Sequence, residues 1–502
     1  MKIKSLLAKP LASYIYKKVQ NDKANAVVHQ QEWMNKIIAK GSSTEFGRSH
    51  HFETIQSHDD FKRHIPLRDY EALKGDIEKI KEGKQNILWP GKPIYLAKSS
   101  GTTSGAKYLP ITKDSISNHM DAARNALLLY MHETGNHAFA DGRMIFLSGS
   151  PELERIGGIP TGRLSGIVNH HIPYYLRRNQ LPSYPTNCIE AWEEKLEKIV
   201  DETIHQDMTL ISGIPPWTQM YFDVLEQRSG KSIGELFPNF SVLVYGGVNF
   251  EPYRAKLMQS IGRKIDTIET YPASEGFLAY QDSQTEAGLL LNTNAGIFYE
   301  FVPANEVFSE NPTRLTLAEV EIGVNYAIIL TTNAGLYGYI IGDTVKFVSK
   351  EPYRIMVSGR IKHFISAFGE HVIGEEVEKA MLNAGAKHNL SISEFTVAPQ
   401  VTPADGSLPY HEWLLAMDEL PQDMEAFAED IDRAMRTLNI YYDDLRTGNI
   451  LQRVKITPLQ ADAFIQYMKS VGKLGGQNKV PRLSNDRAIA DALQAFKIMN
   501  NE

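Results

Sequence analysis

Hydrophobic residues recur every three or four positions in several stretches of the chain, which predicts amphipathic helices. Residues 24–40, 189–205 and 216–228 have this spacing. Short apolar runs typical of buried strands alternate with helical patterns from about residue 93 onward. The clearest of these runs lie at 144–147, 209–214 and 241–245. Alternation of strand and helix is typical of a parallel sheet covered by helices, so this part of the chain is predicted to be α/β.

The pattern changes twice toward the C-terminus. Residues 288–348 are dense in strand signals, with alternating apolar and polar positions, which predicts either a sheet subdomain or an antiparallel extension of the sheet. The last 140 or so residues resemble a separate small α+β domain, with helices expected at 377–384 (ended by Gly385), 424–438 and 461–470, and strands at 394–399, 413–417 and 451–456.

The whole chain is therefore predicted to be α/β, with mixed and parallel sheets flanked by helices in a large N-terminal domain and a smaller, mobile C-terminal α+β domain. The large domain is expected to span 1–358, a hinge 359–366 and the small domain 367–502. A length of 502 residues agrees with two or three domains.

Composition narrows the function classes. Hydrophobic residues make up 42% and charged residues 23%, which excludes a disordered chain or a fibre. The net charge of −7 argues against a dedicated nucleic-acid binder. The single cysteine, Cys188, excludes an intramolecular disulfide and a multi-cysteine metal site. No stretch reaches the roughly 18 to 20 apolar residues of a membrane span. The basic N-terminus, interrupted by Lys9 and Pro10, is interpreted as a helix and not a signal peptide. We expect a cytoplasmic protein; its oligomeric state cannot be predicted.

The strongest local signal is a glycine- and hydroxyl-rich segment between two strand-like runs, YLAKSSGTTSGAKYLPIT. It contains Ser99, Ser100, Gly101, Thr102, Thr103, Ser104, Gly105 and Lys107. Glycines let backbone amides surround an anion, hydroxyls add donors and the lysine adds charge, which favours phosphate binding. The spacing differs from a Walker A loop. The alternative is a flexible Ser/Gly linker.

Three further segments extend the pattern: YPASEG (271–276), YGYIIGDTVKF (337–347) and GRIKHFISAFGEHVIGEEVE (359–378). In this order, the four segments resemble the acyl-adenylate-forming superfamily of acyl-CoA synthetases, firefly luciferase and adenylation domains. LNIYYDDLR (438–446) and QNKVPR (477–482) are similar to C-terminal signatures of the auxin-responsive Gretchen Hagen family of acyl-acid-amido synthetases. The resemblance covers about residues 90–490.

The resemblance implies an ATP-dependent reaction in two halves. A small carboxylic acid is first adenylated, and the acyl group is then transferred to an amine, such as an amino acid, with release of AMP and pyrophosphate. By this resemblance the β- and γ-phosphates of ATP would be held by Ser99, Ser100, Gly101, Thr102, Thr103 and Lys107.

The remaining nucleotide contacts follow from the same resemblance. Gly246 and Gly247 would line the adenine and Tyr271 would stack on it. Ser274 would contact the α-phosphate, and Glu275 would hold Mg²⁺.

Four more residues complete the implied site. Asp343 would accept hydrogen bonds from the ribose hydroxyls, and Arg360 would face ribose or phosphate. Lys362 corresponds to the hinge position. Lys479 corresponds to the catalytic lysine that reaches from the small domain toward the carboxylate and the α-phosphate.

Each assignment has a plainer alternative. Tyr271 could be a core aromatic, Glu275 a solvated acid, Gly342–Asp343 an ordinary turn and Lys479 a surface lysine. Two other functions also stay open: an acyl-CoA ligase with the same first step, and a nucleotide-binding protein without turnover. The acyl pocket carries no readable signature and is expected within 120–250.

Overall fold

The computed structural model describes residues 3–100, 106–172, 177–247, 250–361, 364–365, 367, 370, 372–390, 392–447, 450–474 and 480–498. The chain divides into two compact units. The first contains 1–248 and 257–357, and the second contains 249–256 and 358–502. Within the described ranges, no helix combines the length and the hydropathy needed to cross a bilayer.

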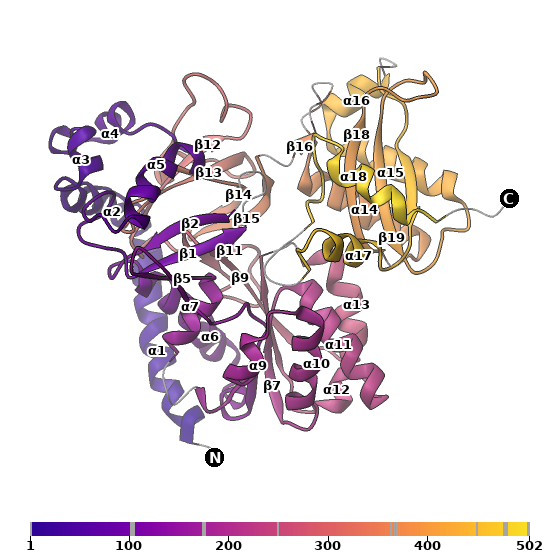
Figure 1. The fold of residues 1–502 in the computed structure, drawn as a ribbon, viewed down its shortest axis with the longest axis horizontal. Helices are drawn as coiled ribbons and strands as arrows, with labels where there is room; N and C mark the ends of the chain where they lie inside the picture. Colours follow the sequence, from indigo (N-terminus) through magenta and orange to yellow (C-terminus); the bar gives the residue numbers. More distant parts are fainter. Residues whose placement is uncertain are drawn as a thin grey trace. The chain divides into compact units, whose positions relative to one another are not determined.

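Helices of the first unit follow the predicted periodicity closely. Residues 24–40 form the end of one helix and most of the next, and the basic N-terminus is helical as expected. The helices are α1 (Ile3–Ala24), α2 (Ala26–Gly41), α3 (Glu45–Ser49), α4 (His58–His64), α5 (Tyr70–Lys81), α6 (Ile116–Thr134), α7 (Leu164–His170), α9 (Tyr184–Cys188), α10 (Trp192–Thr203), α11 (Pro215–Ser229) and α12 (Ile233–Leu236), with α13 (Glu251–Ile261) running across the boundary between the units. Figure 1 shows α1 lying against α6.

Strands of the first unit form two sheets among the described residues. The smaller sheet has the order β2-β1-β5-β4, and the larger has the order β12-β13-β14-β15-β11-β10-β9-β8-β7-β3-β6. The strands are β1 (Tyr95–Ser100), β2 (Ala106–Ile111), β3 (Arg143–Phe146), β4 (Glu154–Ile156), β5 (Ile159–Gly162), β6 (Gln180–Leu181), β7 (Met208–Ser212), β8 (Val242–Gly246), β9 (Asp266–Ala273), β10 (Gly276–Tyr280), β11 (Leu289–Leu291), β12 (Ile297–Pro303), β13 (Asn325–Thr332), β14 (Tyr339–Lys350) and β15 (Tyr353–Arg360).

The larger sheet is parallel at one end and antiparallel at the other. Strands β6, β3, β7, β8 and β9 pair in parallel, as the alternation of strand and helix predicts. The strands β12, β13 and β14 pair antiparallel, which confirms the interpretation of residues 288–348. The predicted α/β class is therefore confirmed.

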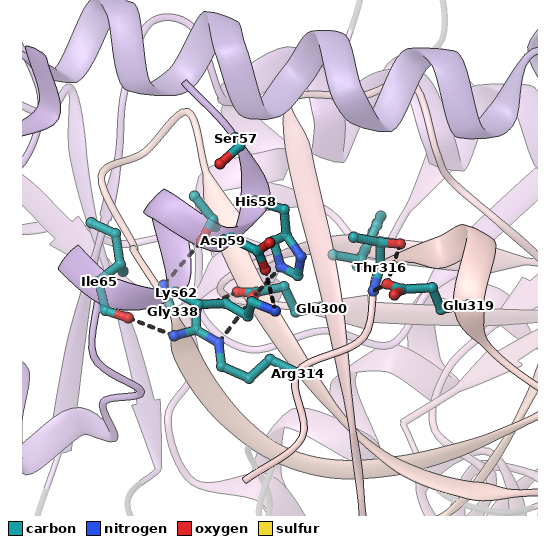
Figure 2. Close-up of polar contacts among 12 residues, drawn as sticks. Ser57, His58, Asp59, Lys62, Ile65, Glu300, Arg314, Thr316, Glu319 and Gly338 are labelled. Atoms are coloured by element: carbon teal, nitrogen blue, oxygen red, sulfur yellow. Dashed lines mark hydrogen bonds and ion pairs between the residues drawn. The ribbon is translucent and has the colours of Figure 1, made fainter. Parts of the chain in front are cut away.

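A buried group of charges fixes the antiparallel end to the N-terminal helices (Figure 2). Arg314 donates from Nε and Nη2 to the carboxylate of Glu300 at 2.9 and 2.7 Å, and from Nη1 to the carbonyl of Ile65 at 2.6 Å. His58 Nε2 lies 2.9 Å from the same carboxylate. Glu300 is 1% exposed, so its carboxylate is shielded from water. Arg314 and His58 therefore have to stabilise its negative charge.

The second unit is built on a small sheet of order β18-β19-β20, with α14 and α15 packed together beside it. Its elements are β16 (Phe364–Ile365), β17 (Val372–Ile373), α14 (Gly374–His388), β18 (Ile392–Gln400), β19 (Tyr410–Met417), α15 (Met424–Leu438), α16 (Ile440–Thr447), β20 (Lys455–Leu459), α17 (Ala463–Ser470) and α18 (Ala488–Leu493).

Two predicted boundaries in this unit are wrong. Helix α14 does not end at Gly385 but continues to His388, where Asn389 adopts a left-handed conformation with φ of 54°. A glycine inside a helix costs only about 1 kcal/mol, and asparagine is a good alternative terminator. The strand expected at 451–456 begins only at Lys455; upstream of it, the carbonyl of Leu451 accepts a hydrogen bond from Arg446 Nη1 at 2.8 Å.

Candidate active site

The glycine- and hydroxyl-rich segment connects two paired strands. In the β1–β2 hairpin, Ser99 lies opposite Lys107 and Ser100 opposite Ala106. The predicted phosphate contacts Gly101, Thr102 and Thr103 lie outside the described residues. The strand pairing brings the two ends of the segment together, which is the geometry that a short anion-binding loop needs.

Lys107 lies beside an aromatic ring at the start of α5. Its Nζ is 5.6 Å from the centre of the Tyr70 ring. The Tyr70 hydroxyl accepts a hydrogen bond from the Tyr108 backbone N–H at 2.9 Å, which fixes α5 to this hairpin. The Tyr70 ring, fixed to the hairpin in this way, lies beside the Lys107 ammonium at the base of the segment.

Four further predicted residues lie at or just after the ends of two parallel strands. Strands β8 and β9 are neighbours and run in the same direction, so Gly246 and the Ser274–Glu275 turn lie at the same edge of the sheet. A Cβ on Gly246 would lie 2.3 Å from the Thr270 carbonyl oxygen, so no larger residue fits there. The next residue, Gly247, has a φ of +82°. Carboxyl ends of parallel strands are the usual ligand-binding edge of an open α/β sheet.

Glu275 lies close to the hydroxyl of Tyr339, at the start of β14. Burial first, and the negative charge of Glu275 second, raise the pKa of Tyr339 well above its usual value. The phenol is 1% exposed and stays protonated, so it can donate to a carboxylate. Tyr70 and Asp69 also lie near enough to influence this pKa. The hairpin with Lys107 and the turn with Glu275 therefore meet around Tyr70 and Tyr339.

Asp343 is paired with Tyr271. The tyrosine hydroxyl donates to Asp343 Oδ2 at 2.7 Å. Strands β10, β11 and β15 separate β9 from β14 in the sheet order, so the sheet must curve back to join them. Tyr271 is 7% exposed and packs in the main core. Its hydroxyl contact orients the carboxylate that we predict to bind ribose.

A β-bulge places Asp343. Pairing of β13 with β14 moves from Ile329–Ile340 to Ala327–Thr344, so β14 contains extra residues at this point. Gly342 lies within the bulge with a φ of +95°, a conformation that side chains disfavour. Bulges often redirect side chains beside active sites. Gly342 and Asp343 therefore lie in a bulge within strand β14 and do not form an ordinary turn.

Three other predicted residues are not placed with Lys107, Glu275 and Asp343. Arg360 ends β15 in the second unit, with an exposed side chain. The predicted hinge Lys362 and the predicted catalytic Lys479 lie outside the described residues. In the part of the chain that the structure describes, no cluster of three or more metal-binding side chains occurs. Glu275 alone nevertheless fits Mg²⁺, which typically binds one or two carboxylates together with phosphate oxygens.

Sequence reasoning missed two features of this edge. Tyr339 lies four residues before Asp343 in a segment already singled out, and its position could have suggested a partner for the site. The second is Lys195 in α10, which is 3% exposed and donates to the carbonyls of Ser148 and Asn187 at 2.9 and 2.7 Å. Burial lowers the pKa of Lys195 to about 8. These bonds hold the loop after β3, whose carboxyl end lies at the same sheet edge as β8 and β9.

Comparison with known proteins gives consistent results along the chain. Sequence profiles of the GH3 family match residues 15–190 (N-terminal domain), 290–360 (central domain) and 375–488 (C-terminal domain). Indole-3-acetic acid-amido synthetase GH3.4 of Arabidopsis thaliana is 23% identical over 90% of this chain and 88% of its own length. Jasmonoyl--L-amino acid synthetase GH3.5 of Oryza sativa subsp. japonica is 23% identical over 91% of this chain and 92% of its own.

Solved structures with the same fold include both amide-forming and thioester-forming enzymes. The GH3.15 acyl acid amido synthetase has a TM-score of 0.80, with 16% identity and 96% of each chain covered. A 2-hydroxyisobutyryl-CoA ligase has a TM-score of 0.59, with 13% identity, and the match covers 95% of this chain and 93% of that one. These similarities confirm the predicted fold.

Proposed function

Because the chain belongs to the GH3 family, we propose that it is an ATP-dependent ligase that joins a small carboxylic acid to an amine, first of all an amino acid. The observation that carries this proposal is the hydrogen bond from Tyr271 to Asp343, which brings Asp343 to the end of strand β9, just before the Ser274–Glu275 turn. Lys107 lies separately at the base of the hydroxyl-rich hairpin. The arrangement offers an acceptor for ribose, a carboxylate for a cation and a lysine for phosphate. The family resemblance stated from the sequence is confirmed by the GH3 profiles that match along the chain.

The reaction has two steps. A carboxylate oxygen attacks the α-phosphorus of ATP, the bond to the β-phosphate oxygen breaks, and pyrophosphate leaves. An amine nitrogen then attacks the acyl carbon, the bond to AMP breaks, and the amine gives up a proton. The protein contributes orientation and compensation of negative charge, which are the main sources of rate enhancement in phosphoryl transfer.

Each site residue has a proposed part in these steps. Lys107 and the hydroxyls from Ser99 to Thr103 bind the β- and γ-phosphates, and Ser274 contacts the α-phosphate. Glu275 holds Mg²⁺, which neutralises phosphate charge when bound. The buried Tyr339 hydroxyl lies near the Glu275 carboxylate. Gly246 and Gly247 leave room for the adenine.

Four more residues complete the proposal. Tyr271 orients Asp343 toward the ribose and offers the adenine its ring. Lys479 compensates charge on the attacking carboxylate and the α-phosphate, and Arg360 faces the nucleotide. Lys362 serves as the hinge on which the C-terminal domain turns between the two half-reactions.

The names of the relatives suggest a first set of substrates. We propose to incubate the protein with ATP, Mg²⁺, pooled amino acids and a panel of indole-3-acetate, jasmonate, 2,4-DB and short saturated carboxylates. Release of AMP together with an amide detected by mass spectrometry is the expected result.

The same assay separates the two alternative functions. Coenzyme A replaces the amino acids in a parallel reaction, and formation of a thioester in place of an amide would make the protein an acyl-CoA ligase. Absence of AMP and pyrophosphate release across the whole panel, with ATP binding retained, would favour a nucleotide-binding protein without turnover.

A further inference from the structure

Arg163 lies at the junction between the small sheet of the first unit and helix α7. It directly follows β5 and precedes the first residue of α7. Strand β5 pairs in parallel with β1, and Gly162 lies opposite Ala97. The carboxyl ends of the two strands therefore lie at the same edge. This register brings the backbone of Arg163 within about 10 Å of Ser99, where the glycine- and hydroxyl-rich segment begins.

Lys107 and Arg163 lie on opposite sides of β1. The small sheet has the order β2-β1-β5-β4, so β2 and β5 are the two neighbours of β1. Lys107 on β2 lies opposite Ser99, whereas Arg163 follows β5 on the other side. The proposed phosphate segment thus has one cation on each side, and the two cations are available to different groups.

The side chain of Arg163 extends across the loop that follows β3. A Cβ built on Gly149 would lie 2.5 Å from Arg163 Cδ, so the aliphatic part of the arginine lies against the backbone of this glycine. Strand β3 pairs in parallel with β7, and its carboxyl end belongs to the ligand-binding edge of the larger sheet. Arg163 therefore joins the carboxyl edges of the two sheets.

Helices α7 and α10 hold this loop from two directions. The Gly149 N–H donates to Ser165 Oγ in α7 at 3.2 Å. Lys195 Nζ in α10 donates to the Ser148 carbonyl at 2.9 Å. A ligand at this position would meet a surface that is already ordered, which lowers the entropy cost of binding.

The guanidinium of Arg163 is half-buried and lacks a counter-ion. Across the ranges that the structure describes, it makes no hydrogen bond and no ion pair. Burial lowers the pKa of Arg163, and the negative charge of Glu190 opposes this shift only in part. The second cation, Lys195, lies near enough for Arg163 to lower its pKa as well. A guanidinium keeps its proton, and a charge shielded from water needs a partner, so an anion would complete this position.

We propose that Arg163 binds a carboxylate of an organic substrate at the joined edges of the two sheets. This inference rests on the proposed function, in which the acid to be adenylated and the acceptor amino acid both carry a carboxylate. The planar guanidinium matches a carboxylate with two parallel hydrogen bonds. Lys107 already serves the phosphates from the other side of β1, which favours an organic carboxylate over ATP as the partner of Arg163.

Two substitutions at Arg163 test the proposal. Arg163→Met keeps an unbranched side chain that can lie over Gly149, but it removes the charge and the donors. Arg163→Lys keeps the charge without the planar fork. The matched control is Arg155→Met on the neighbouring strand β4, because Arg155 is exposed and donates to the Gly158 carbonyl at 3.0 Å.

Thermal unfolding without substrates separates a ligand-binding arginine from a structural one. Removal of an unpaired, half-buried charge relieves a cost of burial, so Arg163→Met should unfold at the wild-type temperature or above it. Arg155→Met should unfold at about the wild-type temperature. A clearly lower unfolding temperature in Arg163→Met than in Arg155→Met would show that Arg163 stabilises the fold, and would overturn the proposal.

Kinetics then identify which substrate supplies the carboxylate. ATP–pyrophosphate exchange without an amino acid reports on the acid alone. If the acid is the partner, its KM should rise about 10- to 100-fold in Arg163→Met and less in Arg163→Lys, while the dissociation constant of ATP changes less than about threefold. If the amino acid is the partner, exchange should stay unchanged, and the KM of the amino acid should rise by a similar factor in amide formation. Arg155→Met should match the wild type in both assays.

The outcomes separate this inference from the proposed function. Unchanged KM values for both substrates, or a loss confined to ATP binding, would overturn the role of Arg163 and leave the function standing. A wild type that releases no AMP with any acid would overturn the function. Carboxylate binding is then measured by thermal shift with acetate, succinate and glutamate. Stabilisation that is present in the wild type and lost in Arg163→Met supports the site, and equal responses of the two proteins overturn it.

Discussion

At the scale of single residues, a tyrosine lies beside each of the two carboxylates that we propose for the site. Tyr271 donates to Asp343 at 2.7 Å, and Tyr339 lies beside Glu275 with its pKa raised by burial. A carboxylate held by one phenol retains further acceptor positions for a ligand. In the proposed nucleotide site, such pairing would lower the cost of ordering the acid on binding.

The Asp343–Tyr271 pair yields a direct prediction for nucleotide binding. We expect Asp343→Asn to weaken ATP binding about 10- to 100-fold, because hydrogen bonds to a charged acceptor contribute about 1.5–3 kcal/mol. Calorimetric titration with ATP measures this change. Tyr271→Phe is the companion variant, since it removes the orienting donor and leaves the carboxylate. Its affinity should fall less. Equal ATP affinity in Asp343→Asn and the wild type would remove Asp343 from the site.

Sequence reasoning proposed residues for the site but could not supply their surroundings. Asp343 and Glu275 stood out because they belong to recognisable segments, and the structure brings both to one region. Their tyrosine partners could not be paired from sequence, because Tyr271 and Asp343 are 72 positions apart and meet only through curvature of the sheet. Lys195 was missed because its buried ammonium bonds backbone carbonyls, which leave no mark in the sequence.

At the scale of elements, the antiparallel end of the sheet is joined to the N-terminal helices by buried charge (Figure 2). Burial alone would raise the pKa of Glu300, but the positive charge of Arg314 and the contact with His58 outweigh it and hold the pKa below its usual value. Removing one member of a buried pair leaves an uncompensated charge, which is the costly event.

Arg314→Met should therefore destabilise the first unit by about 3–5 kcal/mol, as measured by chemical denaturation. Arg228→Met is the matched control, because Arg228 pairs with Glu197 and Asp201 on the surface, where such pairs contribute about 1 kcal/mol or less. Similar losses of stability in the two variants would contradict the structural role of the buried pair.

The pH dependence of this contribution has a defined sign. The pKa of Glu300 is lower in the folded state than in the unfolded chain, so its contribution is present above the unfolded pKa of about 4.3 and is lost as the pH falls toward the folded pKa. The difference in unfolding free energy between the wild type and Glu300→Gln should shrink steadily below about pH 4.3. A difference that stays constant between pH 7 and pH 3 would show that Glu300 is not the titrating group.

Periodicity predicted the elements well and their ends less well. The helix spacing located α10, α11 and α15, because a buried face imposes the period. The end of α14 was misplaced, since Asn389 and not Gly385 adopts the left-handed conformation. The β14 bulge at Gly342 was not predicted, because a bulge depends on the register of a neighbouring strand.

At the scale of the whole molecule, the chain divides the proposed chemistry between two compact units. The first carries Lys107, Glu275 and Asp343, and the second carries Arg360 and the segment that leads to Lys479. A reaction in two steps can use such a division, because one site then serves two sets of reacting atoms in turn.

The most direct test of the central claim is ATP–pyrophosphate exchange in the wild type and in Lys479→Ala, using the carboxylate that performs best in the panel. We predict that the wild type exchanges label and that Lys479→Ala is slower by about 10²- to 10³-fold, the usual effect of removing one charge that stabilises a transition state. ATP binding to the variant, measured by calorimetry, should persist. Exchange at the wild-type rate in Lys479→Ala would contradict the account.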